Sequence, residues 1–437
     1  MSPLMLNIGM FGIMITLLLT GAPLFAVIGA VGVVFGLIIS GPDILPMFAM
    51  RVYAMIMSYS LVSVPLFILM ANLLQRSGIV EEMFEAMFQW SGKMRGSIAL
   101  ATIVTGVILA AMIGVVGASV IALGLLAIPA MMKRNYNKQL LLGTVCAAGT
   151  LGILIPPSIM PIFYSAATQV SVIDLLAGSI LPGLLLGGVF CAYILILVWK
   201  NPDYAPAITD DERIVGFWKK AALGKHMIAP AIIIACVMGT ILAGIASPTE
   251  AAGVGVFAVM ILMGTRKKLT WTALNESLYA TISATGMALW ITFASTIFVG
   301  VYAMGDGQEV INQMVLSLPG GKWGALIFTQ FIYIVLGMFI DWIGICLLIV
   351  PIFSPILVGL GFDPVHVGII FMVNMQLSFL SPPFGYALFF VKGITPSTVS
   401  MEDIWRGAVP FLVLQAIVLV LCSIFPQISM YFPSLLQ

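Results

Sequence analysis

The stretch GILIPPSIMPIFY, residues 152–164, has no charge and is rich in Ile, Leu, Met and Phe, as membrane spans are, yet it contains Pro156, Pro157 and Pro161. Proline removes a backbone donor and clashes with the preceding turn, which costs roughly 3 kcal/mol in a helix interior. In lipid, the carbonyls that it frees have no water to bond. The stretch therefore predicts a helix that is broken part-way across a membrane.

The composition agrees with that reading. Of 437 residues, 61% are hydrophobic and only 8% are charged, which indicates an all-α polytopic membrane protein. The net charge of +1 gives no reason to expect a nucleic-acid partner. The five cysteines form no CxxC pair and the two histidines are far apart, so we expect neither a disulfide nor a metal site built from them. The first basic residue is Arg51, so the N-terminal apolar run is interpreted as a retained span rather than a signal peptide.

Two apolar runs, 97–132 and 323–357, are too long for one span of roughly 20 residues and too short for two spans with a loop. That length favours re-entrant hairpins. Each follows an amphipathic segment, 79–94 or 305–320, which we interpret as an interfacial helix. The long polar stretch 200–225 is typical of a linker between two halves.

The two halves resemble each other. Pro156-Pro157 aligns with Pro382-Pro383 at an offset of 226, and upstream a four-residue adjustment places Pro129 on Pro351 and Ser119 on Asp341. Lys and Arg flank the first hairpin, whereas Asp and Glu dominate beside the second. By the positive-inside rule the halves run in opposite directions and both termini are periplasmic.

The order of events predicts a domain division in which a scaffold alternates with two halves of a transport domain. The predicted units are N-terminal scaffold spans in 1–78, an interfacial arm helix in 79–94, the first transport half in 95–170 (hairpin 97–132, broken helix 138–168), central scaffold spans in 171–275, a span leading to the second repeat in 276–304, a second arm helix in 305–320, the second transport half in 321–395 (hairpin 323–357, broken helix 365–392) and a C-terminal span in 396–437.

Inverted repeats with one broken helix each indicate a secondary transporter whose site lies near the bilayer midplane. Unwound carbonyls can coordinate a cation, and the N-terminus of the outgoing half-helix favours an anion. Small or polar residues surround both breaks: Gly149, Thr150, Gly152 and Ser158 at the first, and Asn374, Gln376, Ser378 and Ser381 at the second. The alternative is a pair of proline-kinked spans that small residues allow to pack closely.

Asp341 has no other charged residue within fifteen positions on either side. A buried carboxylate needs a partner or a neutral state. It can bind Na⁺, carry a proton or cap a helix of the hairpin, and the sequence leaves these alternatives open. The motif SPTE, 247–250, has a simpler interpretation, since Ser247, Pro248 and Glu250 form the capping box that opens a helix.

Several stretches closely resemble the large membrane subunit of TRAP (tripartite ATP-independent periplasmic) transporters, essentially from end to end: GAPLFAVIGAVGVVFG, AAGTLGILIPPSIMPIFY, IASPTEAAGVGVFA, DPVHVGIIFMVN and SPPFGYALFFVKGI. The resemblance implies a Na⁺-driven importer of the bacterial inner membrane, with inverted repeats and an elevator-type transport domain. It also implies a periplasmic solute-binding protein that delivers an organic acid, a small four-helix membrane subunit as partner, surrounding membrane lipid, and no cofactor besides Na⁺ as the coupling ion.

By motif match, the resemblance assigns two sets of residues at the hairpin tips and helix breaks. The substrate set is Gly114, Gly117, Ser119, Pro157, Ser158, Trp342, Ser381 and Pro383. The Na⁺ set is Ser119, Gly149, Thr150, Gly152, Asp341, Gly344, Asn374, Gln376 and Ser378.

The chain departs from the family at both tips. Val115 and Val116 stand where serines are usual, and Trp342-Ile343 follows the aspartate where small or polar residues are usual. These changes favour a monocarboxylate with an apolar or aromatic part, or a 2-oxo acid, over a sugar acid or a small dicarboxylate.

Three other function classes are compared with the sequence: a channel, an intramembrane enzyme and a stand-alone symporter. A channel can also use glycine-rich breaks, but inverted halves favour alternating access. An intramembrane enzyme needs a catalytic constellation in the spans, where only Asp341 is available. A stand-alone symporter, coupled to Na⁺ or H⁺, stays open.

Overall fold

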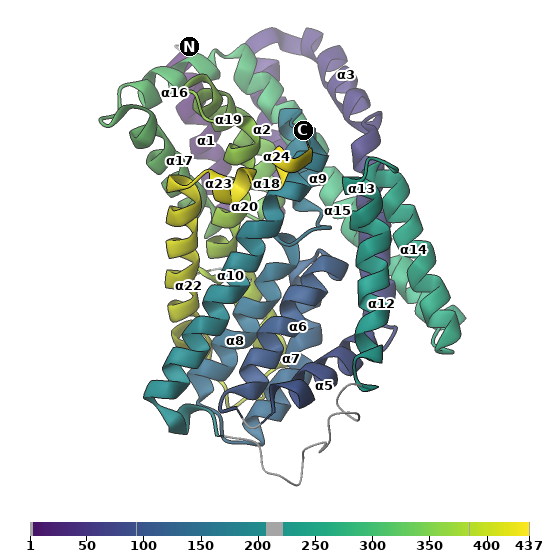
Figure 1. Ribbon diagram of the computed structural model, residues 1–437. Helices are drawn as coiled ribbons and strands as arrows, with labels where there is room; N and C mark the ends of the chain where they lie inside the picture. Colours follow the sequence, from purple (N-terminus) through teal and green to yellow (C-terminus); the bar gives the residue numbers. More distant parts are fainter. Residues whose placement is uncertain (1–2, 93, 207–221, 384, 437) are drawn as a thin grey trace.

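The computed structural model describes residues 3–92, 94–206, 222–383 and 385–436, and every regular element in these ranges is a helix (Figure 1). Among the described residues, six helices are long and apolar enough to cross a membrane, or eight spans if each of two bent helix pairs counts as one. The predicted all-α polytopic class is confirmed.

One group of helices, which we call the scaffold bundle, packs around the long helix α15 and its neighbour α4. Its members are α1 (Pro3–Leu19), α2 (Leu24–Ser40), α3 (Leu45–Ile56), α4 (Ser63–Gln75), α12 (Lys225–Ile234), α13 (Thr240–Leu242), α14 (Pro248–Thr265) and α15 (Trp271–Met304). The chain leaves α3 after Ile56 and enters α4 at Ser63 through a 3₁₀ turn. Pro65 lies in the first turn of α4, where its missing N–H has no helical partner to lose.

The predicted capping box at the start of α14 is confirmed. The Ser247 hydroxyl accepts from the Glu250 N–H at 3.3 Å, and the Glu250 carboxylate accepts from the Ser247 N–H at 2.7 Å. Of the predicted linker 200–225, the structure describes a 3₁₀ turn at Pro202–Tyr204 and the start of α12, and residues 207–221 lie outside the described ranges.

Both predicted hairpins and both broken helices are present. The first repeat consists of α6 (Ser97–Ile113), α7 (Val116–Met132), α8 (Lys138–Thr150) and α9 (Met160–Thr168); the second consists of α17 (Gly321–Gly337), α18 (Trp342–Leu348), α19 (Val350–Gly359), α20 (Pro364–Leu380) and α21 (Tyr386–Ile394). Three helices of the second repeat begin 226 residues after their counterparts: α18 after α7, α20 after α8 and α21 after α9.

This constant offset corrects part of the sequence alignment. The four-residue adjustment upstream of the breaks is wrong, so the counterpart of Asp341 is Val115 rather than Ser119, and the counterpart of Pro129 is Pro355 rather than Pro351. Pro351 corresponds to Leu125, which explains a difference between the hairpins. The outgoing helix of the first is continuous, whereas that of the second bends by 55° between α18 and α19, just before Pro351.

Two further long helices brace the repeats. α10 (Val172–Lys200), which falls in the predicted central scaffold, packs on α6, α20 and α22, and α22 (Met401–Ile424) packs on α8 and α20. Short helices α23 (Gln427–Met430) and α24 (Pro433–Leu436) follow. The scaffold bundle meets the repeats elsewhere, where α4 contacts α6 and α15 contacts α18. The predicted division of the chain into a scaffold and a moving transport domain stays a prediction.

Both predicted arm segments are helical, and both are tied to the scaffold bundle. In α5 (Ile79–Ser91), the Glu82 carboxylate bonds His226 Nδ1 at 2.8 Å and Arg266 at 2.7 Å. At α16 (Gly307–Leu316), the Tyr302 hydroxyl donates to the Gly307 carbonyl at 2.5 Å. Figure 1 shows α5 and α16 at opposite ends of the molecule, with the N-terminus toward the α16 end.

The crossing of α8 and α22 depends on two glycines in contact. A Cβ added at Gly143 would overlap the carbonyl oxygen of Gly407, and one added at Gly407 would lie 2.5 Å from the carbonyl oxygen of Gln139. The two backbones therefore touch with no space for a side chain on either.

We expect Gly143→Ala to destabilise the protein by about 1–3 kcal/mol, since the clash is with backbone that cannot rotate away. Thermal unfolding in nanodiscs measures this. The matched control is Gly188→Ala on α10, where nothing lies within 4 Å of the added Cβ. Equal melting temperatures for the two variants would contradict this account of the crossing.

Candidate functional site

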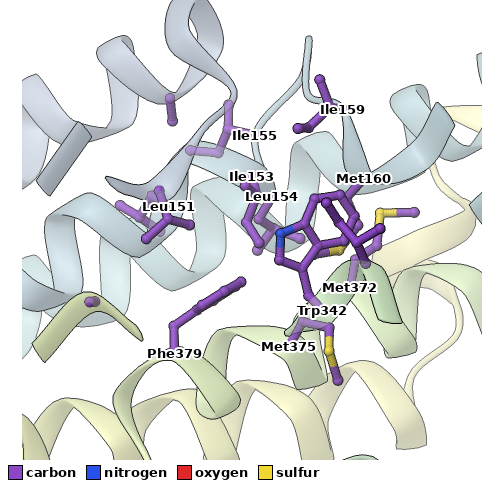
Figure 2. Packing of buried hydrophobic residues seen from close by; sticks show 14 of the residues in the cluster. Leu151, Ile153, Leu154, Ile155, Ile159, Met160, Trp342, Met372, Met375 and Phe379 are labelled. Carbon is purple, nitrogen blue, oxygen red and sulfur yellow. The ribbon is translucent and has the colours of Figure 1, made fainter. Parts of the chain in front are cut away.

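Each broken helix is interrupted at its double proline. The first break runs from the end of α8 at Thr150, through a 3₁₀ turn at Leu151–Ile153, to the start of α9 at Met160. The second lies between Leu380 and Tyr386. The Pro156-Pro157 and Pro382-Pro383 peptide bonds are both cis. Figure 2 shows Leu151, Ile153 and Leu154 of the first break in one apolar cluster with Trp342 and Phe379 of the second repeat.

A hairpin tip covers each break. Gly114 ends α6 in the left-handed region at φ 64°, and a Cβ there would lie 3.1 Å from the Pro157 carbonyl oxygen. The first tip thus rests directly on the first double proline, which needs a residue without a side chain. At the second tip, the Asp341 carboxylate accepts from the Ile343 N–H at 3.4 Å and caps α18.

Both tips and both breaks meet the scaffold bundle at one cavity of about 170 Å³, which we call the central cavity. The scaffold bundle contributes part of its wall, mainly small and apolar side chains of α4 and α15. Its lining is Ile68, Ala71, Asn72, Val115, Val116, Ala118, Ile153, Ile159, Phe163, Ala280, Ala284, Met287, Ala288, Asp341, Trp342, Ile343, Phe379 and Tyr386.

A second cavity of about 220 Å³ adjoins it and also reaches Asp341. It lies between the second tip and the second break, where Gly337, Ser378 and Phe389 line it. Among the described residues that line either cavity, Asp341 is the one acid, and none is Lys, Arg or His. The half-buried Asp341 carboxylate therefore has no basic side chain among the described residues that line these cavities.

Polar atoms near the second break lack partners. The Asn374 amide donates to the Gln330 side-chain oxygen at 2.8 Å, but Asn374 Oδ1, both polar atoms of Gln376 and the Ser378 hydroxyl have no hydrogen-bond partner among the described residues. All three side chains are buried. Unpaired buried oxygens are costly, and oxygen atoms are the ligands that hard cations prefer. They fit a cation bound on this side of the site.

The residues of the predicted Na⁺ set around the first break make contacts within the protein, and their role in binding Na⁺ stays a prediction. Ser119 donates to the Val115 carbonyl at 3.0 Å, and Thr150 donates to the Ala147 carbonyl at 2.9 Å. Gly149 packs on Val120, and a Cβ at Gly152 would lie 2.8 Å from the Ser119 hydroxyl oxygen. At the second tip, Gly344 packs on Leu24 and Ile340.

Of the predicted substrate residues, Trp342 lines the central cavity, and the others are not among its lining residues. Gly117 faces the Phe390 ring, and Ser158 is buried with an unpaired hydroxyl. The Ser381 hydroxyl donates to the Leu377 carbonyl at 2.8 Å. Pro383 is exposed.

Several residues that line the central cavity were not predicted from the sequence. Phe163 packs edge-to-face on Trp342 with ring centroids 5.6 Å apart, and Phe379 and Tyr386 complete an aromatic wall. Position relative to the prolines could have found them, since each lies within one or two turns of a break. Nothing in the sequence marks the scaffold contribution, which comes from the alanines of α15 and from Asn72.

The comparison with known families decides the assignment. The family model "Tripartite ATP-independent periplasmic transporter, DctM component" matches residues 11–428. The chain belongs to this family. It is therefore a subunit of a TRAP transporter and not an enzyme, as the resemblance implied.

Two curated relatives and one solved structure illustrate the range of this similarity. The C4-dicarboxylate TRAP transporter large permease protein DctM of Vibrio cholerae is 30% identical over 98% of this chain and 97% of its own length. The isethionate TRAP transporter permease protein DctMQ of Oleidesulfovibrio alaskensis is 28% identical over 97% of this chain, which spans 66% of that protein. The YdaH transporter of Alcanivorax borkumensis shares the fold, with a TM-score of 0.67 at 13% identity over 94% of this chain and 97% of its own.

Two substitutions separate the capping role of Asp341 from a role of its charge. Asparagine caps helices as well as aspartate, whereas alanine costs about 1 kcal/mol. We expect Asp341→Asn to unfold at the wild-type temperature or above it without Na⁺, since a buried charge is removed, and Asp341→Ala to unfold below it. Addition of Na⁺ should stabilise the wild type and neither variant.

The control is Asp363→Asn, which changes an exposed N-cap of α20 and should leave the Na⁺ response intact. A full Na⁺ response in Asp341→Asn would show that Asp341 only caps α18. The measurement is thermal unfolding in nanodiscs at constant ionic strength, with choline replacing Na⁺.

Proposed function

We propose that this chain is the translocating subunit of a secondary active importer, which uses a Na⁺ gradient to take up an organic carboxylate delivered by a periplasmic solute-binding protein. The observation that carries the proposal is the central cavity, where two inverted repeats and the scaffold bundle meet around one half-buried carboxylate, with no basic side chain among the described lining residues.

Electrostatics links the two solutes. An organic anion that enters the central cavity lies near Asp341, and neither cavity offers a cationic side chain to offset the repulsion. Two carboxylates in a medium of low polarity cannot both stay charged without a cation. Binding of the anion therefore favours simultaneous binding of a cation, which is the thermodynamic basis of symport.

Na⁺ is the favoured coupling ion because an oxygen atom without a hydrogen-bond partner lies beside Asp341. The Ser378 hydroxyl, unpaired among the described residues, lines the same cavity as Asp341, and the unpaired Asn374 Oδ1 lies one turn earlier on α20. A proton needs a single base, whereas a metal ion needs several oxygen ligands. A stand-alone symporter coupled to Na⁺ or H⁺ is the alternative.

The partners follow from the family. The family description is tripartite and periplasmic. The match to the relative named DctMQ leaves about a third of that protein uncovered, as expected of a large subunit joined to a small one. We propose a small four-helix membrane subunit and a periplasmic binding protein as partners in the bacterial inner membrane. Apolar side chains on the outer faces of α14 and α15, such as Phe257, Tyr279 and Ile282, are exposed as lipid or subunit contacts require.

An elevator motion is consistent with how the central cavity is built. One wall comes from α4 and α15, and the other comes from the tips and breaks of both repeats. A rigid movement of the repeats past α4 and α15 would carry the bound solutes with it. Arg266 bonds α5, and Lys138 bonds Asp403 at the start of α22, so basic residues gather at the end opposite the N-terminus, which supports periplasmic termini.

Uptake in proteoliposomes tests the proposal. Vesicles contain this chain and its small membrane partner, the binding protein is outside, and a Na⁺ gradient is imposed in the presence of a panel of labelled organic acids. We expect accumulation that needs both Na⁺ and the binding protein, and that Asp341→Asn reduces by at least about tenfold.

Three other outcomes separate the alternatives. Accumulation without the binding protein indicates the stand-alone symporter. Accumulation driven by a pH gradient alone indicates H⁺ coupling. Downhill flux that needs neither an ion gradient nor a binding protein indicates a channel and contradicts the proposal.

A further inference from the structure

The two repeats carry different side chains at equivalent positions that line the central cavity. Val115 and Asp341 are counterparts at the offset of 226, each is the N-cap residue of the outgoing helix of its hairpin, and both line the cavity. One tip therefore presents an isopropyl group where the other presents a carboxylate.

The difference extends over the whole wall. The first repeat contributes only apolar side chains to the central cavity: Val115, Val116, Ala118, Ile153, Ile159 and Phe163. The second repeat contributes Asp341 and Tyr386, which carry polar groups, in addition to Trp342, Ile343 and Phe379. From the scaffold bundle, Asn72 is the one polar lining residue described, and its amide donates to the Thr281 hydroxyl at 3.1 Å.

We infer that the substrate binds in one fixed orientation, with a single carboxylate toward the second repeat and a branched aliphatic or aromatic body against the first. This inference rests on the proposed function and adds the substrate class and the residues that select it. Val115, Val116, Ile159 and Phe163 form the pocket for the apolar body, and Trp342 limits its size from the opposite side through its contact with Phe163.

The physical reason is desolvation. A dicarboxylate bound across the cavity would place its second charged end among valine, isoleucine and phenylalanine side chains, which can neither donate a hydrogen bond nor offset a charge. An apolar end of the same shape would instead gain the free energy of leaving water. A site that cannot hydrogen-bond one end of a ligand discriminates strongly against charge at that end.

Pairs of compounds of the same shape test this inference directly. Glutarate and 5-methylhexanoate differ only in having a carboxylate or an isopropyl group at one end, and 2-oxoglutarate and 5-methyl-2-oxohexanoate form a second such pair. The complex of this chain with its small membrane partner is placed in nanodiscs at saturating Na⁺, without the binding protein, so that its own selectivity is measured. Stabilisation against thermal unfolding at a series of ligand concentrations gives the affinity.

For the wild type we expect the methyl member of at least one pair to bind about tenfold or more tightly than its dicarboxylate partner. The double variant Val115→Thr and Val116→Thr keeps the side-chain shape and adds two hydroxyl groups to the apolar wall. Threonine is also a favourable N-cap at position 115, so folding should be preserved. The preference for the methyl member should fall by about tenfold in this variant.

The control is Val104→Thr, the same change at an exposed position of α6, which should leave the preference unchanged. Tighter binding of the dicarboxylate members, equal binding within both pairs, or stabilisation by no member of either pair would overturn the inference. Na⁺-driven uptake of some organic acid in proteoliposomes would then still support the proposed function, whereas its absence would overturn both.

Discussion

A helix can be broken inside a membrane only where other parts of the protein surround the backbone that the break exposes. Much of this structure meets that requirement. Gly114 brings the first hairpin tip against the Pro157 carbonyl, and the first break is buried among side chains of both repeats. The first hairpin, α6 and α7, lies toward the α5 end of the molecule, and the second, α17 and α18, lies toward the α16 end (Figure 1). The long helices α10 and α22 then hold the repeats together.

The repeats share a backbone plan but not a chemistry. A constant offset of 226 residues relates the starts of three helix pairs, although the identity between the halves is thin. Burial in lipid and in the interior of the fold constrains both halves in the same way, so their geometry is alike. The side chains that line the cavity between the repeats are free of that constraint. There Val115 of the first repeat occupies the position equivalent to that of Asp341 in the second.

Strong local signals in the sequence were sufficient for most of the fold. The double prolines located the breaks, the length of two apolar runs identified the hairpins, and Ser247 with Glu250 located a helix start to the residue. The register of the upstream part was wrong by four residues, because prolines at 129, 351 and 355 offered two matches and only helix starts distinguish them. The sequence pattern alone does not show which proline lies at a helix terminus and which lies in a helix interior.

The site was harder to predict, because a cavity is formed by residues that share no local pattern. Asp341 and Trp342 stood out by charge and by size, whereas Ala280, Ala284 and Asn72 come from helices far away in the chain. Glycines near the breaks, such as Gly117 and Gly149, pack closely against Phe390 and Val120, and their contact with a ligand stays a prediction. Small residues at membrane depth are needed for both purposes, and sequence alone does not separate them.

A single carboxylate at one of two equivalent tips also bears on how coupling is enforced. With a carboxylate at both tips, the cavity would need more than one cation before any organic anion could enter. With none, an anion could enter alone, and nothing would prevent its leak down a gradient. One Asp341 beside cavities that lack basic lining residues makes the empty site attractive to a cation and the cation-bound site neutral toward an anion. On this reasoning, the asymmetry that we propose to orient the substrate is the same asymmetry that would link its entry to that of the ion.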